Sequence, residues 1–226
     1  MAQDVAAIRK ERDGLIKRGL WRDIVTSYQE KLLPISDQES GADLQKCVDA
    51  LGALQKWEEF DPIVEKAVTR HPENAWLLMS AAGLYYSTNH SGEIIAGEFI
   101  RGNRYGRGGD DGAAEIGRPV NPFYRDQIRA LQLVRQALNQ APDDATRIGI
   151  WSNTASYLYT YGPAWKLQTL TPLETLPDWG ESGPAGGTEG APWKDDAPVI
   201  YEVPASWEAA KMMANAGVSH WRRDLV

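Results

Sequence analysis

The side chains that could do nucleophilic or metal chemistry are few in this sequence and lie far apart. The chain has one cysteine, Cys47, and three histidines, His71, His90 and His220. A catalytic cysteine needs partial exposure and a nearby base, but Cys47 falls on the apolar stripe of an expected helix, where a packed thiol is the better interpretation. The histidines have no metal-ligand spacing. We therefore expect no catalytic residues, no metal site and no enzyme activity.

Two loop patterns imitate ligand sites. The pairs Asp110-Asp111 and Asp195-Asp196 could bind calcium weakly, although solvated loop charge is the preferred interpretation. Five glycines follow Arg101 within eleven residues, which resembles a phosphate cradle. A phosphate loop follows a strand and opens directly into a helix, whereas here an expected helix precedes and prolines follow. Residues 102–121 are therefore predicted to be a Gly-rich linker, and no cofactor is expected.

Charge and hydropathy exclude two classes of partner. The 226 residues carry a net charge of −7 and a pI near 5.1, which argues against nucleic acid because phosphate binding needs a clustered positive field. No stretch approaches the roughly 20 apolar residues of a membrane span. The first residues lack the pattern of a secretory signal. Either the protein is cytoplasmic, or a leader was removed.

The elements that must position these residues are helices, and an internal sequence repeat relates them. Apolar stripes predict helices within residues 5–19, 20–33, 44–54, 57–70, 74–86 and 94–100, taken as three hairpins. Leu20-Trp21-Arg22-Asp23-Ile24 recurs as Lys56-Trp57-Glu58-Glu59-Phe60, and 57 − 21 gives a period of 36. Each copy ends at a proline, Pro34 or Pro72. A tetratricopeptide repeat has a period near ~34 and a closing proline.

The expected fold class is therefore all-α: antiparallel helical hairpins stacked as a short TPR-like solenoid, with a Gly/Pro/Trp-rich excursion near the C-terminus. Residues 1–101 are assigned to TPR-like hairpins and 102–121 to the linker. Residues 122–161 are assigned to a further hairpin, 162–204 to the excursion, and 205–226 to a terminal helix and tail.

Eight of the nine tryptophans divide into two groups, and the ninth, Trp221, lies in the tail. Four are expected at inward helix positions, as structural aromatics of the repeats: Trp21, Trp57, Trp76 and Trp151. Four others are candidates for a partner-binding surface, because large aromatic rings anchor loops and contacts: Trp165, Trp179, Trp193 and Trp207.

Several stretches, in order, resemble the N-terminal helical-repeat region of large bacterial alpha-2-macroglobulin-like proteins. They are Tyr124-Arg125-Asp126-Gln127-Ile128-Arg129-Ala130-Leu131-Gln132-Leu133, Leu176-Pro177-Asp178-Trp179, Ala191-Pro192 and Ser206-Trp207-Glu208-Ala209-Ala210-Lys211. In that family, helical repeats precede macroglobulin domains that trap or inhibit proteases outside the cytoplasm. The resemblance implies a periplasmic or cell-surface location. The family's thioester motif, where present, lies downstream and is absent here, so this chain is not expected to trap a protease.

The chain departs from the family pattern after Lys211. The family continues with a run similar to Asn-Asp-Gly-Glu-Arg-Trp-Arg. Back-translation of residues 212–218 with one base restored in front forces Asp-Gly and permits the other residues in order. We therefore expect residues 212–226 to be read out of frame; the alternative is a genuine tail.

Three functions remain in order of preference. The first is a non-catalytic interaction or spacer module, an N-terminal fragment of an alpha-2-macroglobulin-like protease-inhibitor-type protein, whose partner is another protein or the downstream macroglobulin domains. The second is a free-standing TPR-type adaptor that binds a peptide in its concave face. The third is a carbohydrate-binding module that uses the loop tryptophans.

Overall fold

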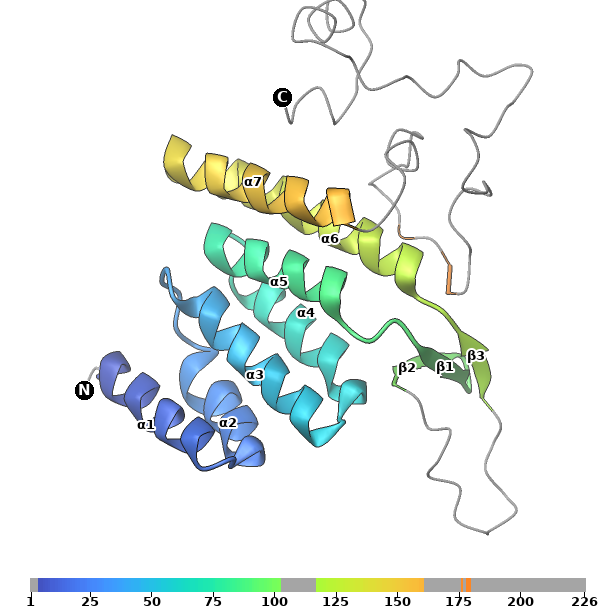
Figure 1. Cartoon of the computed structure of the whole chain (residues 1–226), viewed down its shortest axis with the longest axis horizontal. Coiled ribbons are helices and arrows are strands. Elements are labelled where there is room, and N and C mark those ends of the chain that lie inside the picture. Colours follow the sequence, from blue (N-terminus) through green and yellow to red (C-terminus); the bar gives the residue numbers. More distant parts are fainter. Residues whose placement is uncertain (1–3, 103–116, 161–175, 177, 180–226) are drawn as a thin grey trace, which may run out of the picture. The chain divides into compact units, whose positions relative to one another are not determined.

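A computed structural model of the chain describes residues 4–102 and 117–160, together with Leu176, Asp178 and Trp179 (Figure 1). Two compact units are distinguished. The first unit is Met1–Pro142 with Leu176–Glu181, and the second is Asp143–Thr175 with Ser182–Val226. Each unit is described by itself below. The described part is mostly helical, as the apolar periodicity predicts.

The first unit begins with five α-helices, whose existence and order the sequence predicted. They are α1 (Val5–Lys17), α2 (Trp21–Ser27), α3 (Ser40–Leu54), α4 (Phe60–Arg70) and α5 (Ala75–Ser87). A π-helical turn, η1 (Tyr28–Leu32), continues α2, and a 3-10 turn, η2 (Trp57–Glu59), leads into α4. Side-chain caps fix two of the starts, because Asp4 accepts from the backbone of α1 and Asn74 accepts from the Leu77 N–H of α5.

The helix α3 packs against both α2 and α5. A glycine sets the close approach of α3 to α5: a Cβ at Gly41 would lie 2.6 Å from the carbonyl oxygen of Trp76. The Ser80 hydroxyl donates to the Gly41 carbonyl across the same contact, at 2.8 Å. The core of the first unit consists of fully buried side chains, including Ile24, Leu44, Cys47, Leu51, Phe60, Val64 and Leu78.

The prediction of a helix at residues 94–100 was wrong. This stretch is a β-hairpin of β1 (Gly92–Ile95) and β2 (Glu98–Arg101), in which Ile95 pairs with Glu98 across a two-residue turn. The turn residues Ala96 and Gly97 have φ of 51° and 86°, as a tight hairpin turn requires. Neighbouring β-branched isoleucines also favour a strand over a single helical turn.

The sheet has a third strand, β3 (Arg118–Val120), within the stretch that the sequence assigned to a linker. The strand order is β2-β1-β3, and both pairings are antiparallel. The expectation of an all-α fold is therefore corrected to a mostly helical fold with a small sheet. Residues 103–116, which join β2 to β3, lie outside the described residues.

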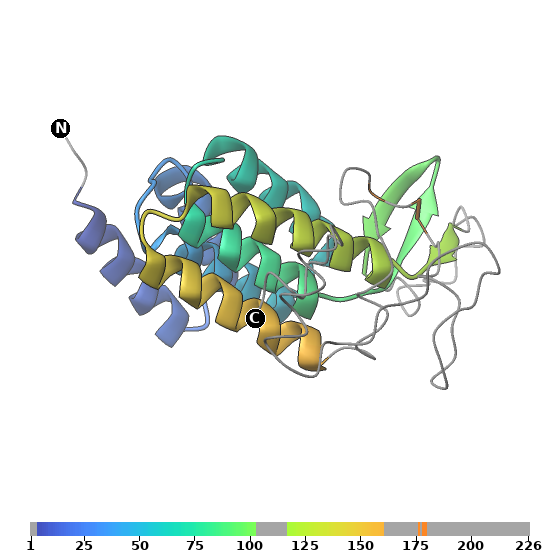
Figure 2. The ribbon, with the colours of Figure 1, turned by 90° about the horizontal axis from the view of Figure 1, so that it is seen from above.

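After the sheet, α6 (Phe123–Gln140) returns and packs along α5. Figure 2 shows these two helices side by side, with the sheet beyond the end of α5 and the start of α6. The helix α6 lies within residues 122–161, where the sequence predicted a further helical hairpin. Its residues Ile128 and Val134 are buried, whereas Leu131 and Leu138 are half-buried.

The described part of the second unit is α7 (Asp144–Thr160). Asp143 caps this helix, because its carboxylate accepts from the backbone N–H of Thr146 at 2.7 Å. Ile148 of this helix is 67% exposed despite its apolar side chain. Among the described helices of both units, none is long and apolar enough to cross a membrane.

Candidate functional site

Among the described residues of the first unit, Arg101, the last residue of β2, makes the largest set of side-chain hydrogen bonds. Its guanidinium is fully buried, and each of its five N–H groups donates to an acceptor at 2.8 Å. Two N–H groups reach the Asp61 carboxylate, two reach the Asp126 carboxylate, and one reaches the Asn89 carbonyl. A guanidinium has five donors in a fixed fork, so Arg101 has no donor left for a ligand.

The acceptors come from different elements. Asp61 lies in the first turn of α4, Asp126 lies in the first turn of α6, and Asn89 lies between α5 and β1. Burial alone would lower the pKa of Arg101, but the hydrogen bonds to Asp126 and Asp61 outweigh this and hold its pKa above the ordinary value. A buried cation is tolerated when it is paired in this way. Arg101 therefore fixes the sheet to two helices.

His90 extends this cluster. Its Nδ1 lies 2.8 Å from the Asp126 carboxylate, and its Nε2 lies 3.2 Å from the Tyr86 carbonyl oxygen. The ring also packs edge-on against Phe123, with 4.8 Å between centroids. His90 thus contacts α5 and α6 from the loop between α5 and β1, and its role here is positional.

A second ion pair joins the same helices. Arg129 of α6 makes a bidentate contact with Glu65 of α4, at 2.7 and 2.6 Å, and the Tyr85 hydroxyl of α5 donates to Glu65 at 2.7 Å. Burial lowers the pKa of Arg129, but Glu65 more than offsets this and raises it. Bidentate pairs fix geometry as well as adding energy, so α4, α5 and α6 are held in one arrangement.

Next to this cluster, aromatic rings and guanidinium groups alternate. The Arg101 guanidinium carbon lies 4.9 Å from the ring centre of Phe60 and 5.3 Å from that of Phe99. The Phe99 ring stacks on Trp179 with 3.8 Å between centroids and 12° between planes. Arg125 lies over the Trp179 ring at 4.2 Å. We call Phe99 and Arg125 the tryptophan slot.

Phe99 and Arg125 hold Trp179 from opposite sides. Groups centred 3.8 Å and 4.2 Å from one ring cannot share a face without overlapping, so each covers a different face. Burial lowers the pKa of Arg125, and the Asp178 and Asp126 carboxylates offset part of that shift. The slot thus offers a flat apolar face, and a partly buried cation that an aromatic ring and a neighbouring carboxylate both stabilise.

A separate charged cluster holds α1 on α3. Asp43 of α3 is 2% exposed and accepts from both Arg9 and Arg12, of which Arg12 is 3% exposed. Arg9 also makes a bidentate contact with Asp37 at 2.9 and 2.7 Å. The hydrogen bonds from Arg9 lower the pKa of Asp37. This cluster joins α1 to α3, since its arginines and aspartates form ion pairs with one another.

Cys47 lies where the sequence predicted. Its side chain is fully buried in α3. Burial, together with the nearby Glu59 carboxylate, raises its thiol pKa to about 12. The expectation of a packed thiol on an apolar stripe is confirmed. Within residues 4–102 and 117–160, no group of three or more His, Cys, Asp or Glu side chains is arranged to hold a metal ion.

The structural tryptophans are half-buried rather than core residues: Trp21, Trp57, Trp76 and Trp151. Trp57 lies against two glycines, because a Cβ at Gly52 would be 3.3 Å from its ring and one at Gly102 would be 3.1 Å from its Cβ. Its aromatic ring therefore bridges α3 and the end of β2. This differs from the inward helix position that the sequence predicted for Trp57.

Of the four candidate surface tryptophans, the structure describes Trp179 alone, half-buried in the slot. Trp165, Trp193 and Trp207 lie outside the described residues, as do His220 and the carboxylate pairs Asp110-Asp111 and Asp195-Asp196.

Sequence reasoning missed the Arg101 cluster. It placed Arg101 at the end of the helical hairpins, next to the Gly-rich linker, because a single arginine carries no signal of burial. A usable signal is that both carboxylate partners lie in the first turn of a helix shortly after an aromatic residue: Asp61 comes one residue after Phe60, and Asp126 comes two residues after Tyr124. Position alone did not indicate that these two helix starts meet.

Comparisons with protein-family models, with curated protein sequences and with solved structures found no match for this chain.

Proposed function

We propose that the chain is a non-catalytic helical-repeat module that acts as an interaction or spacer segment. The observation that carries the proposal is the spacing of helix starts. The helices α1, α3 and α5 begin at Val5, Ser40 and Ala75, so that 40 − 5 and 75 − 40 both give 35. The helices between them begin at Trp21 and at the η2 turn of Trp57, and 57 − 21 gives 36. A constant period of helix pairs is typical of repeat arrays.

The third pair supports the same interpretation with one modification. After α5, the position of its partner helix is interrupted by the sheet, and α6 follows at Phe123. Like the earlier partner helices, α6 begins with an aromatic and ends before a proline, Pro142. It packs on α5 and pairs with Glu65 of α4. The sheet is thus an insertion into the third hairpin, with Arg101 as its anchor.

We propose that the chain is part of a larger alpha-2-macroglobulin-like protein, because several of its stretches resemble that family. Its partner would be a protein or the downstream macroglobulin domains, and its location would be periplasmic or at the cell surface. Reading the genomic DNA through codon 211 and beyond tests this. We expect one missing base next to codon 212 and, once it is restored, an open frame that encodes macroglobulin-like domains. An uninterrupted gene that encodes residues 212–226 and then stops would overturn the proposal.

A peptide-binding adaptor is the second candidate, and the tryptophan slot favours it. In the slot, a short segment distant in sequence contacts the sheet and α6 through one aromatic side chain. Among the described residues nothing comparable favours a carbohydrate-binding module, because Phe99 and Arg125 cover the Trp179 ring, which therefore cannot stack on a sugar.

A further inference from the structure

Trp179 occupies the tryptophan slot from a segment that is distant from Phe99 and Arg125 in sequence. Leu176–Glu181 belongs to the same compact unit as Met1–Pro142, although residues 143–175 separate the two in sequence. The contact therefore joins parts of the first unit that are far apart in the sequence. An aromatic side chain in a slot beside a charge is a common anchor for a short recognition motif.

The chemistry of the slot specifies its occupant. Phe99 accepts a flat ring at 3.8 Å. Arg125 contributes a cation at 4.2 Å from the other face of that ring, and this cation also interacts with the Asp178 carboxylate. Among aromatic side chains, tryptophan gives the strongest cation–π contact. A tryptophan directly preceded by an acidic residue satisfies both groups, and this chain provides Asp178-Trp179.

The slot rests on a fixed frame. Phe99 lies on β2, two residues before the fully buried Arg101, and Arg125 adjoins Asp126, which Arg101 also holds. The two walls of the slot are therefore positioned by one ion-pair cluster. Because the walls are preorganised, a ligand loses little binding energy in ordering them.

We propose that the slot formed by Phe99 and Arg125 is an exchangeable recognition site for an acidic residue followed by tryptophan, filled in this state by the chain's own Asp178-Trp179. The site is thus self-occupied, and a partner with the same dipeptide has to displace the internal segment. This inference rests on the proposed role as an interaction module and names the surface and the partner chemistry.

The test uses the full chain with Trp179→Ala, which empties the slot, and a fluorescein-labelled peptide with the sequence of residues 174–181. We expect saturable binding, read as fluorescence anisotropy, that is lost when the tryptophan of the peptide is replaced by alanine. Wild-type protein should bind the peptide at least about tenfold more weakly, because a slot filled nine-tenths of the time leaves only a tenth available. Trp21→Ala serves as the matched control, since it removes a tryptophan elsewhere and should bind as the wild type does.

Two double variants assign the binding to the slot. Phe99→Leu with Trp179→Ala keeps an apolar residue on β2 and should abolish binding. Arg125→Gln with Trp179→Ala should weaken it several-fold, and more so at low salt, because a charge interaction is screened at high salt. Circular dichroism shows that each variant is folded.

The inference is overturned if folded Trp179→Ala protein does not bind the peptide, if it binds no more tightly than the wild type, or if Phe99→Leu leaves the binding unchanged. None of these outcomes affects the gene sequence beyond codon 211, and a gene that ends at codon 226 does not change the peptide result. The two proposals therefore fail independently.

Discussion

Replacing Arg101 with methionine removes the centre of the ion-pair cluster while keeping a long apolar side chain in the same space. Five hydrogen bonds at 2.8 Å are lost. Asp126, which is 2% exposed, keeps His90 as a partner but loses a bidentate cation. Asp61, whose side chain is 27% exposed, can regain water. The cost is therefore concentrated at Asp126.

Removing one partner of a buried ion pair costs about 3–5 kcal/mol, because it leaves an uncompensated buried charge. For a chain of this size each kcal/mol lowers the melting temperature by roughly 2–4 °C. We therefore expect Arg101→Met to lower the midpoint by roughly 6–20 °C. Adding Asp126→Asn and Asp61→Asn should recover part of the loss, since no unpaired carboxylate then remains.

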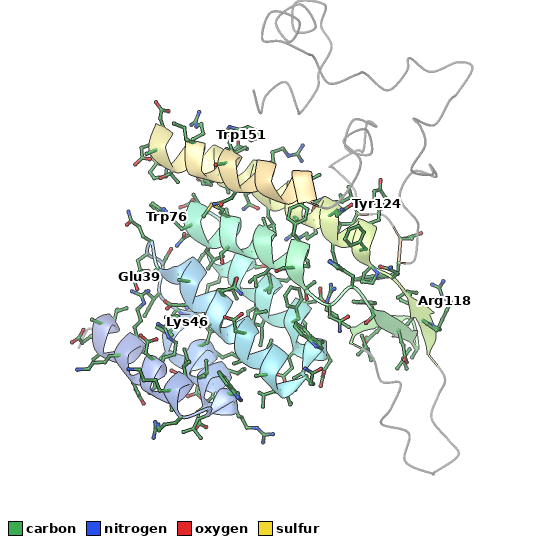
Figure 3. The ribbon with its side chains drawn as sticks, viewed as in Figure 1. Glu39, Lys46, Trp76, Arg118, Tyr124 and Trp151 are labelled. Atoms are coloured by element: carbon green, nitrogen blue, oxygen red, sulfur yellow. The ribbon has the colours of Figure 1, made fainter. Side chains whose placement is uncertain are left out.

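The assay is urea unfolding monitored by far-ultraviolet circular dichroism, with the melting temperature measured in parallel. The matched control is Arg118→Met on β3, where the arginine is exposed (Figure 3). This control should change the free energy of unfolding by less than about 0.5 kcal/mol. If Arg101→Met costs no more than this control, the cluster does not hold the sheet to the helices and the reasoning is refuted.

Three further predictions concern the helical part. Cys47 should resist iodoacetamide at pH 9 until urea unfolds the chain, because burial holds its thiol pKa near 12; equal rates in native and unfolded protein would contradict its burial. Asp37 has a lowered pKa, so its contribution to stability is present above its unfolded pKa of about 3.9 and is lost as pH falls through the folded value. In the Asp37→Asn variant the free energy of unfolding should therefore fall less steeply below about pH 4 than in the wild type. Substitution of the exposed Asp23 by Asn should leave this pH dependence unchanged. Gly41→Ala should lower the free energy of unfolding by about 1–3 kcal/mol, because the new Cβ would meet the Trp76 carbonyl oxygen at 2.6 Å. Gly14→Ala, where the space is open, should raise the free energy of unfolding by about 0.5–1 kcal/mol. Similar effects of the two substitutions in chemical denaturation would contradict the close approach of α3 and α5.

The helices were predictable from sequence because their signals are local. Apolar residues three and four apart located α1, α3, α4 and α5, and Pro34 and Pro72 follow the helices that they were expected to end. The inward face of α3 followed from the same stripe, so the burial of Cys47 was predictable. Such signals need no knowledge of what packs where.

The sheet and the cluster were not predictable because their signals are short or distant. Ile94 to Ile100 contains isoleucines compatible with one helical turn, and the deciding feature is the two-residue turn at Ala96-Gly97. Arg101 meets Asp61 and Asp126 across 40 and 25 residues, and periodicity cannot detect such a contact. The half-burial of Trp21 and Trp57 was not predictable for the same reason. An apolar stripe indicates which face of a helix points inward, but it does not show how much of a side chain the neighbouring elements cover.

The most direct test of the repeat interpretation removes one helix pair. A chain that begins at residue 36 lacks α1 and α2, but it keeps α3 to α6, the sheet and the Arg101 cluster. In a repeat array each unit contacts only its neighbours, so the shortened chain should keep its helical circular dichroism per residue and unfold cooperatively at a lower midpoint. A shortened chain with the spectrum of a random coil would show that the helices share one indivisible core, and would contradict the proposal of a helical-repeat module.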